Sequence, residues 1–219
     1  MCTLTTSPCS SVVMRLLAEA RDSDSRLDQE RRALPPDQLA RMMTSTDYRS
    51  LYGVLKDFHL AVSTETATLL YMLARSRRAT TIVEFGTSFG VSTVHLAAAL
   101  RDNGGGRLIG TELEPTKVAQ ARANIAMAGL DDLTEIRAGD AIETLAEDLP
   151  ETVDLVLLDG AKGLYPKLLS LLEPRLRSGS LIVADNADWS PEYLARVRVP
   201  GGSYLSVPFA ADVELSMRL

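Results

Sequence analysis

Short apolar runs rich in β-branched residues alternate with stretches of helical periodicity over most of the chain. Five of these runs predict strands, at residues 81–85, 108–111, 133–137, 153–158 and 180–184. Three helical stretches lie between them, at residues 91–101, 116–128 and 164–176. Strands and helices that alternate at this spacing form β-α-β units, so we expect an α/β fold with a mostly parallel sheet and helices on both faces.

The two ends of the chain depart from this alternation. Residues 204–208 and 213–218 flank a short turn and predict a terminal hairpin, so one strand should close the sheet in the antiparallel direction. At the other end, helical spacing is found at residues 11–32 and 37–58, separated by a Pro-Pro pair, and again after Val62. We therefore expect N-terminal accessory helices in residues 1–60 and an α/β domain in residues 61–219.

The composition fits one ordinary hydrophobic core. The chain has 219 residues, of which 46% are hydrophobic and 24% charged, and this excludes a disordered acidic chain. The net charge of −6 and the pI near 5.0 argue against nucleic acid as a partner. The longest apolar run, Val94–Leu100, contains His95 and is far shorter than the roughly 20 residues of a membrane helix, so no membrane partner is expected.

The cysteines and the first residues bear on the compartment. Cys2 and Cys9 both lie in the N-terminal stretch and suit neither a disulfide framework nor a thiolate metal site. Residues 1–8 lack the basic and then apolar pattern of a secretory leader. We therefore expect a reduced, cytoplasmic location.

Candidate chemistry follows the strands, because a parallel α/β sheet binds ligands outside the carboxyl ends of its strands. The first strand ends in a turn with Gly86 and Gly90, which permit close backbone approach and a tight start of the next helix. This Gly-x-x-x-Gly turn differs from the Gly-x-Gly-x-x-Gly dinucleotide fingerprint, so it favours a smaller zwitterionic ligand over a pyrophosphate. Ser92 either bonds the carboxylate of that ligand or caps the helix.

Acidic residues follow the next two strands. Glu112, 26 residues beyond Gly86, is placed to accept both hydroxyls of a ribose, or is a solvated acid at a strand end. The tripeptide Gly139-Asp140-Ala141 offers a carboxylate and backbone amides near the expected position of an adenine, although Gly-Asp is also ordinary turn chemistry.

Hard oxygen ligands follow the fourth and fifth strands. Asp159 ends one strand and Asp185-Asn186 ends the other, giving two carboxylates and an amide oxygen, a partial set that suits Mg²⁺. Lys162, three residues after Asp159, is one of only four lysines among 23 basic residues. Lysine, unlike arginine, can lose its proton, so Lys162 is a candidate general base; standing alone it would be a surface lysine.

Taken together, these motifs resemble the cation-dependent, S-adenosylmethionine-dependent O-methyltransferases, a family that includes catechol and caffeoyl-CoA O-methyltransferases and many bacterial members. The resemblance extends from about Val62 to Leu219 and rests on Glu84-x-Gly86-x-x-x-Gly90, Glu112, Asp159-x-x-Lys162 and Asp185-Asn186. It implies a Rossmann-like class I methyltransferase fold, with a seven-stranded, mostly parallel sheet and an antiparallel last strand.

The resemblance also implies cofactors and residue roles. The cofactors would be S-adenosylmethionine and Mg²⁺ or another divalent cation, and bacterial members are commonly homodimers. Lys162 would be the base, and the metal ligands would be Asp159, Asp185 and Asn186. The implied cofactor contacts are Val62, Glu84, Gly86, Thr87, Ser92, Glu112, Asp140 and Ala141.

The expected reaction is therefore Mg²⁺-dependent methyl transfer to a hydroxyl of a vicinal-dihydroxy aromatic small molecule. The alternative is a methyltransferase of the same fold that acts on a non-catechol hydroxyl of a natural product or on nitrogen.

Two further features bear on the acceptor. Gly160-Ala161 replaces the bulky His-Trp pair of mammalian catechol enzymes, which predicts an open acceptor side and an acceptor larger than catechol. Residues 37–60 either form a lid over the acceptor, or pack on the sheet or in a dimer interface; their large apolar side chains are Met42, Met43, Tyr48, Tyr52 and Phe58.

Overall fold

The computed structural model describes residues 2–32, 47–210 and 212–219. The first part of the predicted helix 37–58, with Met42 and Met43, and the Pro-Pro pair before it lie outside the described residues.

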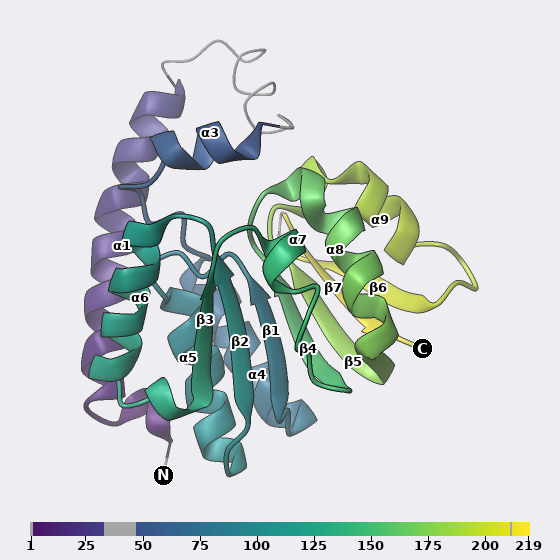
Figure 1. Cartoon of the computed structure of the whole chain (residues 1–219), viewed down its shortest axis with the longest axis horizontal. Helices are drawn as coiled ribbons and strands as arrows, with labels where there is room; N and C mark the ends of the chain where they lie inside the picture. The colour runs from purple at the N-terminus through teal and green to yellow at the C-terminus, as the bar shows by residue number, and fades with distance from the viewer. Residues whose placement is uncertain (1, 33–46, 211) are drawn as a thin grey trace.

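In the described part of the chain, seven strands form one sheet in the order β3-β2-β1-β4-β5-β7-β6 (Figure 1). The strands are β1 Thr81–Phe85, β2 Arg107–Glu112, β3 Thr134–Ala138, β4 Val153–Leu158, β5 Leu176–Ala184, β6 Tyr204–Phe209 and β7 Val213–Arg218. The first five strands pair in parallel, and β7 is antiparallel to both of its neighbours, β5 and β6. The predicted parallel sheet with a reversed last strand is confirmed.

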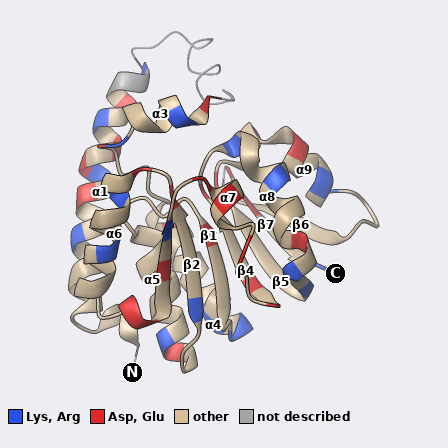
Figure 2. Ribbon diagram, viewed as in Figure 1, with Lys and Arg blue, Asp and Glu red and all other residues tan. Residues whose placement is uncertain are grey.

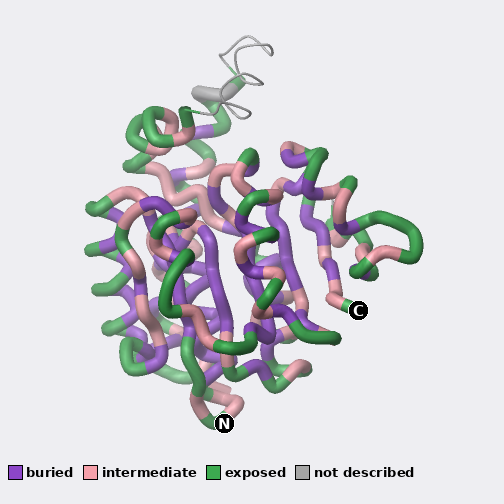
Figure 3. The backbone as a smooth tube through the Cα atoms, turned by 45° about the vertical axis from the view of Figure 1, so that its right-hand side comes forward, coloured by how far each residue is buried: buried purple, intermediate pink, exposed green. Residues whose placement is uncertain are grey.

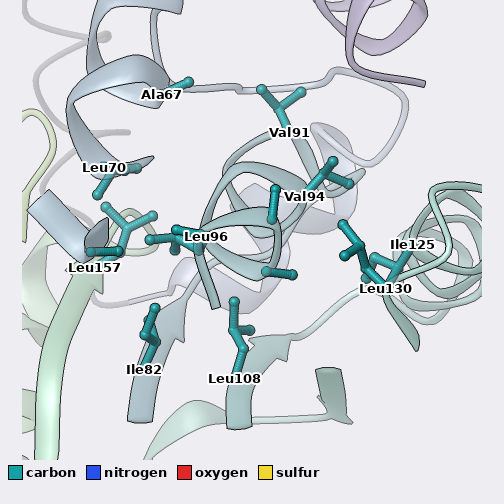
Figure 4. Close-up of a cluster of buried hydrophobic side chains, with 14 of the residues drawn as sticks. Ala67, Leu70, Ile82, Val91, Val94, Leu96, Leu108, Ile125, Leu130 and Leu157 are labelled. Carbon is teal, nitrogen blue, oxygen red and sulfur yellow. The ribbon is translucent and has the colours of Figure 1, made fainter. Parts of the chain in front are cut away.

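Helices cover both faces of this sheet and produce two apolar cores. The helices are α1 Cys9–Arg32, α3 Tyr48–Val54, α4 Thr64–Arg77, α5 Val91–Asn103, α6 Pro115–Met127, α7 Ala141–Thr144, α8 Tyr165–Leu172 and α9 Pro191–Val197. On one face, α1, α4, α5 and α6 pack around side chains such as Ile82 and Leu157, as Figure 4 shows for part of this core. On the other face, α7, α8 and α9 pack on Val83 and Val156. The central strands are buried on both sides, which explains their mainly apolar sequence (Figure 3).

The N-terminal helix α1 belongs to the main core. Its buried residues Cys9, Val12, Leu16 and Ala20 lie in the same cluster as α5 and α6. Helix α1 therefore packs as part of the main core.

The structure differs from the predicted elements around the fifth strand. The predicted helix 164–176 ends at Leu172, because Pro174 supplies no backbone donor and the chain turns into β5. The first residues of β5 include the exposed Arg177 and Ser178, so its amino-terminal half lacks the apolar signature of a buried strand. Helix α9 was not predicted at all; its sequence signal is Pro191 at the first helical position.

Among the described residues, no helix is long and apolar enough to cross a membrane.

Candidate active site

Two carboxyl groups meet at the carboxyl ends of neighbouring strands. Asp159 follows β4 and Asp185 follows β5, and both side chains are more than nine-tenths buried. Their carboxyl groups lie within hydrogen-bonding reach of each other. Burial and the charge of Asp159 raise the pKa of Asp185 to about 8, and burial also raises the pKa of Asp159. Two carboxylates at this separation need a positive charge between them to be stable in ionised form.

Asn186 adds a third oxygen to this pair. Its backbone is left-handed, with φ of 47°, and its amide Nδ2 donates to Asp212 Oδ2 over 2.9 Å. The amide oxygen thereby remains an acceptor beside Asp185. Within the described ranges, no three His, Cys, Asp or Glu side chains group into a metal site, so the candidate centre depends on this amide. Two carboxylates and one amide are hard oxygen donors, and they fit a divalent cation such as Mg²⁺.

Lys162 stands directly against the carboxyl pair. Its Nζ lies 3.0 Å from Asp159 Oδ1, in a buried ion pair. Burial lowers the pKa of Lys162, but Tyr165, Asp159, Tyr52 and Asp185 outweigh burial and hold the pKa well above its ordinary value. In this arrangement the ammonium is protonated and paired with Asp159.

The glycine turn after β1 approaches this centre closely. Gly86 has φ of 95°, and a Cβ there would lie 2.3 Å from the carbonyl oxygen of Asp159. Only glycine fits, so the turn and the end of β4 form one surface. That surface continues into a cleft past the ends of β1, β2 and β3, whose lining includes Gly86, Glu112, Asp140 and Ala141. A smaller hollow beside it is lined by Val62, Thr87 and Ser92, among others.

Glu84 is the one predicted cofactor contact that does not line either hollow. Its carboxyl group is fully buried beneath the turn and accepts hydrogen bonds from Thr87 Oγ1 at 2.9 Å, Ser92 Oγ at 2.6 Å and Thr93 Oγ1 at 2.6 Å. Burial raises the pKa of Glu84 to about 7. Glu84 therefore fixes the turn from beneath, and it accepts a hydrogen bond from the Ser92 hydroxyl that the sequence analysis did not predict.

Glu112 and Asp140 are fixed by donors from their surroundings. Glu112 accepts from the backbone amides of Ser88 at 2.8 Å and Glu114 at 2.9 Å, one on each oxygen. Asp140 caps α7 by accepting from Ile142, and it also accepts from the Tyr48 hydroxyl and from Arg49. Burial raises the pKa of Asp140, but these donors outweigh it and hold the pKa below its ordinary value. Figure 2 shows such acidic residues along the loops at this end of the sheet.

Sequence reasoning missed Lys117 and Ser88, which also line the cleft. Lys117 is buried in the first turn of α6, and its Nζ lies 3.2 Å from Ser88 Oγ and 5.3 Å from the centre of the Phe89 ring. Burial lowers its pKa. Two features of the sequence could have identified Lys117. Lysine is scarce in this chain, and Lys117 lies only five residues beyond Glu112.

A larger cavity of about 300 Å³ adjoins the carboxyl pair. One wall carries Asp159, Ala161, Lys162, Asp185 and Asn186. The opposite wall comes from α1 and the segment after residue 47, and it carries Leu27, Tyr48, Leu51, Tyr52 and Leu55. The cavity shares Tyr48, Tyr52, Leu60, Asp159, Ala161 and Leu164 with the cleft, so the two spaces adjoin.

The space beside Gly160 is filled, contrary to the expectation of an open side. A Cβ on Gly160 would lie 2.3 Å from the Phe85 ring. The missing side chain makes room for Phe85, and only Ala161 of this pair lines the large cavity.

Comparison with known proteins agrees with this arrangement. Residues 83–187 match the model of a methyltransferase domain. A catechol O-methyltransferase of Niastella koreensis is 38% identical over 130 residues, which are 58% of each chain. A catechol O-methyltransferase of Mycobacterium tuberculosis is 32% identical over 73% of this chain and 66% of its own. An O-methyltransferase from Bacillus cereus, solved in complex with SAH, has the same fold, with a TM-score of 0.69 at 21% identity over 80% of this chain and 90% of its own.

The fold and the matched region define a methyltransferase-domain protein. The chain is similar over this region to O-methyltransferases, among them catechol O-methyltransferases. It spans about three fifths to two thirds of the length of these curated relatives.

Proposed function

We propose that the chain is an S-adenosylmethionine-dependent O-methyltransferase that uses Mg²⁺, or another divalent cation, to methylate one hydroxyl of a vicinal-dihydroxy aromatic molecule. One observation carries the proposal: the buried carboxyl pair of Asp159 and Asp185, with Lys162 against it, lies where the cleft meets the large cavity. The relatives named catechol O-methyltransferase support this acceptor class.

The cleft residues would bind S-adenosylmethionine, which supplies the methyl group as an electrophile. Glu112 would accept from the ribose hydroxyls, and Asp140 and Ala141 would contact the adenine. At the methionine end, Val62, Thr87 and Ser92 line the smaller hollow. Gly86 permits the close approach of the ligand to the backbone. Glu84 would act through Thr87 and Ser92, because its carboxyl group is buried beneath them.

Asp159, Asp185 and Asn186 would hold the divalent cation. When bound, the cation lowers the pKa of an acceptor hydroxyl, which for a free phenol is about 10. Lys162 would accept the proton of that hydroxyl. Since Lys162 is paired with Asp159, its action as a base requires that Asp159 be engaged by another partner. The shared wall of the two spaces would bring the methyl group and the acceptor oxygen together.

The opposite wall would cover the acceptor. Tyr48 and Tyr52 offer flat rings, and Leu27, Leu51 and Leu55 offer apolar side chains, which suit an aromatic ring. A cavity of about 150 Å³ accommodates benzene, whereas this cavity measures about 300 Å³. The volume supports an acceptor larger than catechol and the lid interpretation of the described part of residues 37–60.

The test is a mass-spectrometric screen of methyl acceptors, with and without EDTA. The panel pairs catechol with larger vicinal diols, and each diol with its monohydroxy and amino counterparts. Methylation confined to vicinal diols and abolished by EDTA is expected. Activity that persists in EDTA contradicts the metal role, and methylation of a lone hydroxyl or of nitrogen supports the alternative function. Catechol as the best acceptor contradicts the size argument.

We also propose a homodimer and a cytoplasmic location. Leu205 and Val207 are 58% and 54% exposed on β6, which is an edge strand of the sheet. Exposed apolar residues on an edge strand favour pairing with another chain. Light scattering should give twice the chain mass, and Leu205→Ser with Val207→Ser should lower it; a monomeric parent chain contradicts the dimer. The thiols of Cys2 and Cys9 are both unpaired, which supports a reducing compartment.

A further inference from the structure

A single hydroxyl connects the two strand ends that carry the carboxyl pair. Tyr165, the first residue of α8, is fully buried. Its hydroxyl lies 2.8 Å from the carbonyl oxygen of Leu158 and 2.8 Å from the carbonyl oxygen of Asp185. One carbonyl belongs to the last residue of β4, and the other to the first residue beyond β5.

These two carbonyls belong to the peptide units attached to the candidate metal ligands. The Leu158 carbonyl is part of the peptide bond that leads into Asp159. The Asp185 carbonyl is part of the peptide bond between Asp185 and Asn186, and Asn186 then adopts φ of 47°. Fixing both peptide planes fixes the Cα atoms from which all three candidate ligands project.

The ladder of the sheet ends just before this point. The parallel pairing of β4 with β5 extends to Leu158 and Ala184, and the Asp185 amide still donates to the Leu158 carbonyl over 2.9 Å. The Asp185 carbonyl lies beyond that last pair, and it shares the single hydroxyl proton of Tyr165 with the Leu158 carbonyl. The hydroxyl therefore extends the connection between the strands by one residue, to the position where the two carboxyl groups repel each other.

The ring of Tyr165 is held independently of its hydroxyl. It packs edge-on against Phe85 at 6.2 Å and against Tyr193 at 5.8 Å between ring centres. The Nζ of Lys162 lies 5.6 Å from the same ring centre. Removal of the hydroxyl alone leaves these ring contacts in place and removes its bonds to the two carbonyls and its contact with Lys162.

We propose that Tyr165 is a positioning residue for the metal centre: its hydroxyl holds the peptide units of Asp159 and Asp185 at the separation that a divalent cation requires. The inference rests on the proposed metal-dependent function. It assigns to Tyr165 an effect on metal affinity and none on cofactor affinity, because its hydroxyl contacts the two strand ends beneath the carboxyl pair and the Lys162 side chain, none of which lines the cleft.

The experiment compares Tyr165→Phe with Tyr193→Phe in the full chain. Tyr193 is equally buried and packs edge-on against the same ring, yet its hydroxyl contacts neither strand-end carbonyl. Mn²⁺ and Mg²⁺ dissociation constants are measured by calorimetry, S-adenosylmethionine affinity is measured in EDTA, and thermal unfolding is followed for each variant. Tyr165→Phe should weaken metal binding about 10-fold to 100-fold and leave cofactor affinity unchanged.

A second readout separates positioning from general damage. The Mg²⁺ concentration for half-maximal activity should rise in Tyr165→Phe, and high Mg²⁺ should restore most of the turnover. Tyr193→Phe should keep the parental metal affinity even if its melting temperature falls. Unchanged metal affinity in Tyr165→Phe, equal losses in both variants, or turnover that Mg²⁺ does not restore would overturn the inference. A parent chain that binds no divalent cation would instead refute the metal-dependent function.

Discussion

At the scale of single residues, two buried lysines lie at opposite ends of the site, and their surroundings act on them differently. Lys117 beside the cleft has its pKa lowered by burial. At Lys162, burial acts in the same direction, but the nearby acidic groups outweigh it and the pKa rises. The difference follows from Tyr165 and from the carboxyl pair, which Lys162 contacts through Asp159.

Substitution of Lys162 by arginine tests its role as a base. Lys162→Arg keeps the positive charge but removes a side chain that can release its proton, so kcat should fall by about 10²-fold or more. The loss should be smaller for acceptors already ionised at the assay pH. Lys167→Arg, on the exposed side of α8, is the matched control and should keep full activity. If Lys162→Arg retains most of the activity, Lys162 contributes its positive charge and does not act as the base.

Substitution of Glu112 tests the cofactor site. Glu112→Ala removes an acceptor that the ribose hydroxyls would use, at a cost of roughly 1.5–3 kcal/mol, or about tenfold to a hundredfold in affinity. Calorimetry with S-adenosylmethionine measures the effect. Glu114→Ala is the control, because Glu114 lies two residues further on and does not line the cleft. Equal affinities in the two variants would contradict the ribose role.

At the scale of elements, α1 behaves as part of the core. Leu16 on its inner face is 1% exposed, whereas Met14 on its outer face is 65% exposed. Leu16→Ala should therefore cost about 2–5 kcal/mol in the free energy of unfolding, and Met14→Ala should cost almost nothing. Urea denaturation measures both. A small effect of Leu16→Ala would mean that α1 is indeed dispensable, as the term accessory implies.

The helix α3 makes a separate prediction about the acceptor. Tyr52→Ala should raise the acceptor KM more than it weakens S-adenosylmethionine binding if its ring covers the large cavity, because Tyr52 lines the cavity and also its border with the cleft. Val54→Ala is the control on the same helix, because Val54 is 72% exposed and does not line the cavity. Wild-type kinetics in Tyr52→Ala on every active acceptor would contradict the lid.

The elements differ in how far the sequence predicts them. The central strands and the turns after them could be predicted from the sequence, because burial on both faces makes β1 and β4 mainly apolar and each strand is followed by glycine or aspartate. The start of β5 could not be predicted from the sequence, because Arg177 and Ser178 are exposed there and give no apolar pattern. The candidate metal ligands Asp159, Asp185 and Asn186 could be predicted from the sequence, because they come directly after strands. The wall formed by α1 and α3 depends on contacts between distant segments, so Leu27 and Leu51 carry no local signal.

At the scale of the whole molecule, two buried acids make stability depend on pH. The folded-state pKa values of Glu84, about 7, and Asp185, about 8, exceed the ordinary values of 4.5 and 3.8. Such groups take up protons on folding, so their contribution to stability is present at low pH and is lost as the pH rises through the folded pKa. The metal-free protein should therefore lose stability between about pH 5 and about pH 8, by at most about 1.4 kcal/mol per unit for each group.

Denaturation in urea and EDTA across this range measures the slope. Glu84→Gln should reduce the slope mainly below about pH 7, and Asp185→Asn should reduce it up to about pH 8. Added Mg²⁺ should stabilise the parent chain most at the alkaline end, where both carboxyl groups are ionised. A flat profile in the parent chain would contradict the raised pKa values.

The large cavity has walls of two different origins, and this has a consequence for evolution and engineering. The wall that carries Asp159, Lys162 and Asp185 is positioned by strands that pair within the sheet. The opposite wall comes from α1 and α3, near the start of the chain. Mutations at Leu51 and Leu55 change the shape of the space without touching a candidate ligand. Acceptor preference can therefore drift, or be selected in a library confined to these helices, while the chemistry at the strand ends is inherited unchanged.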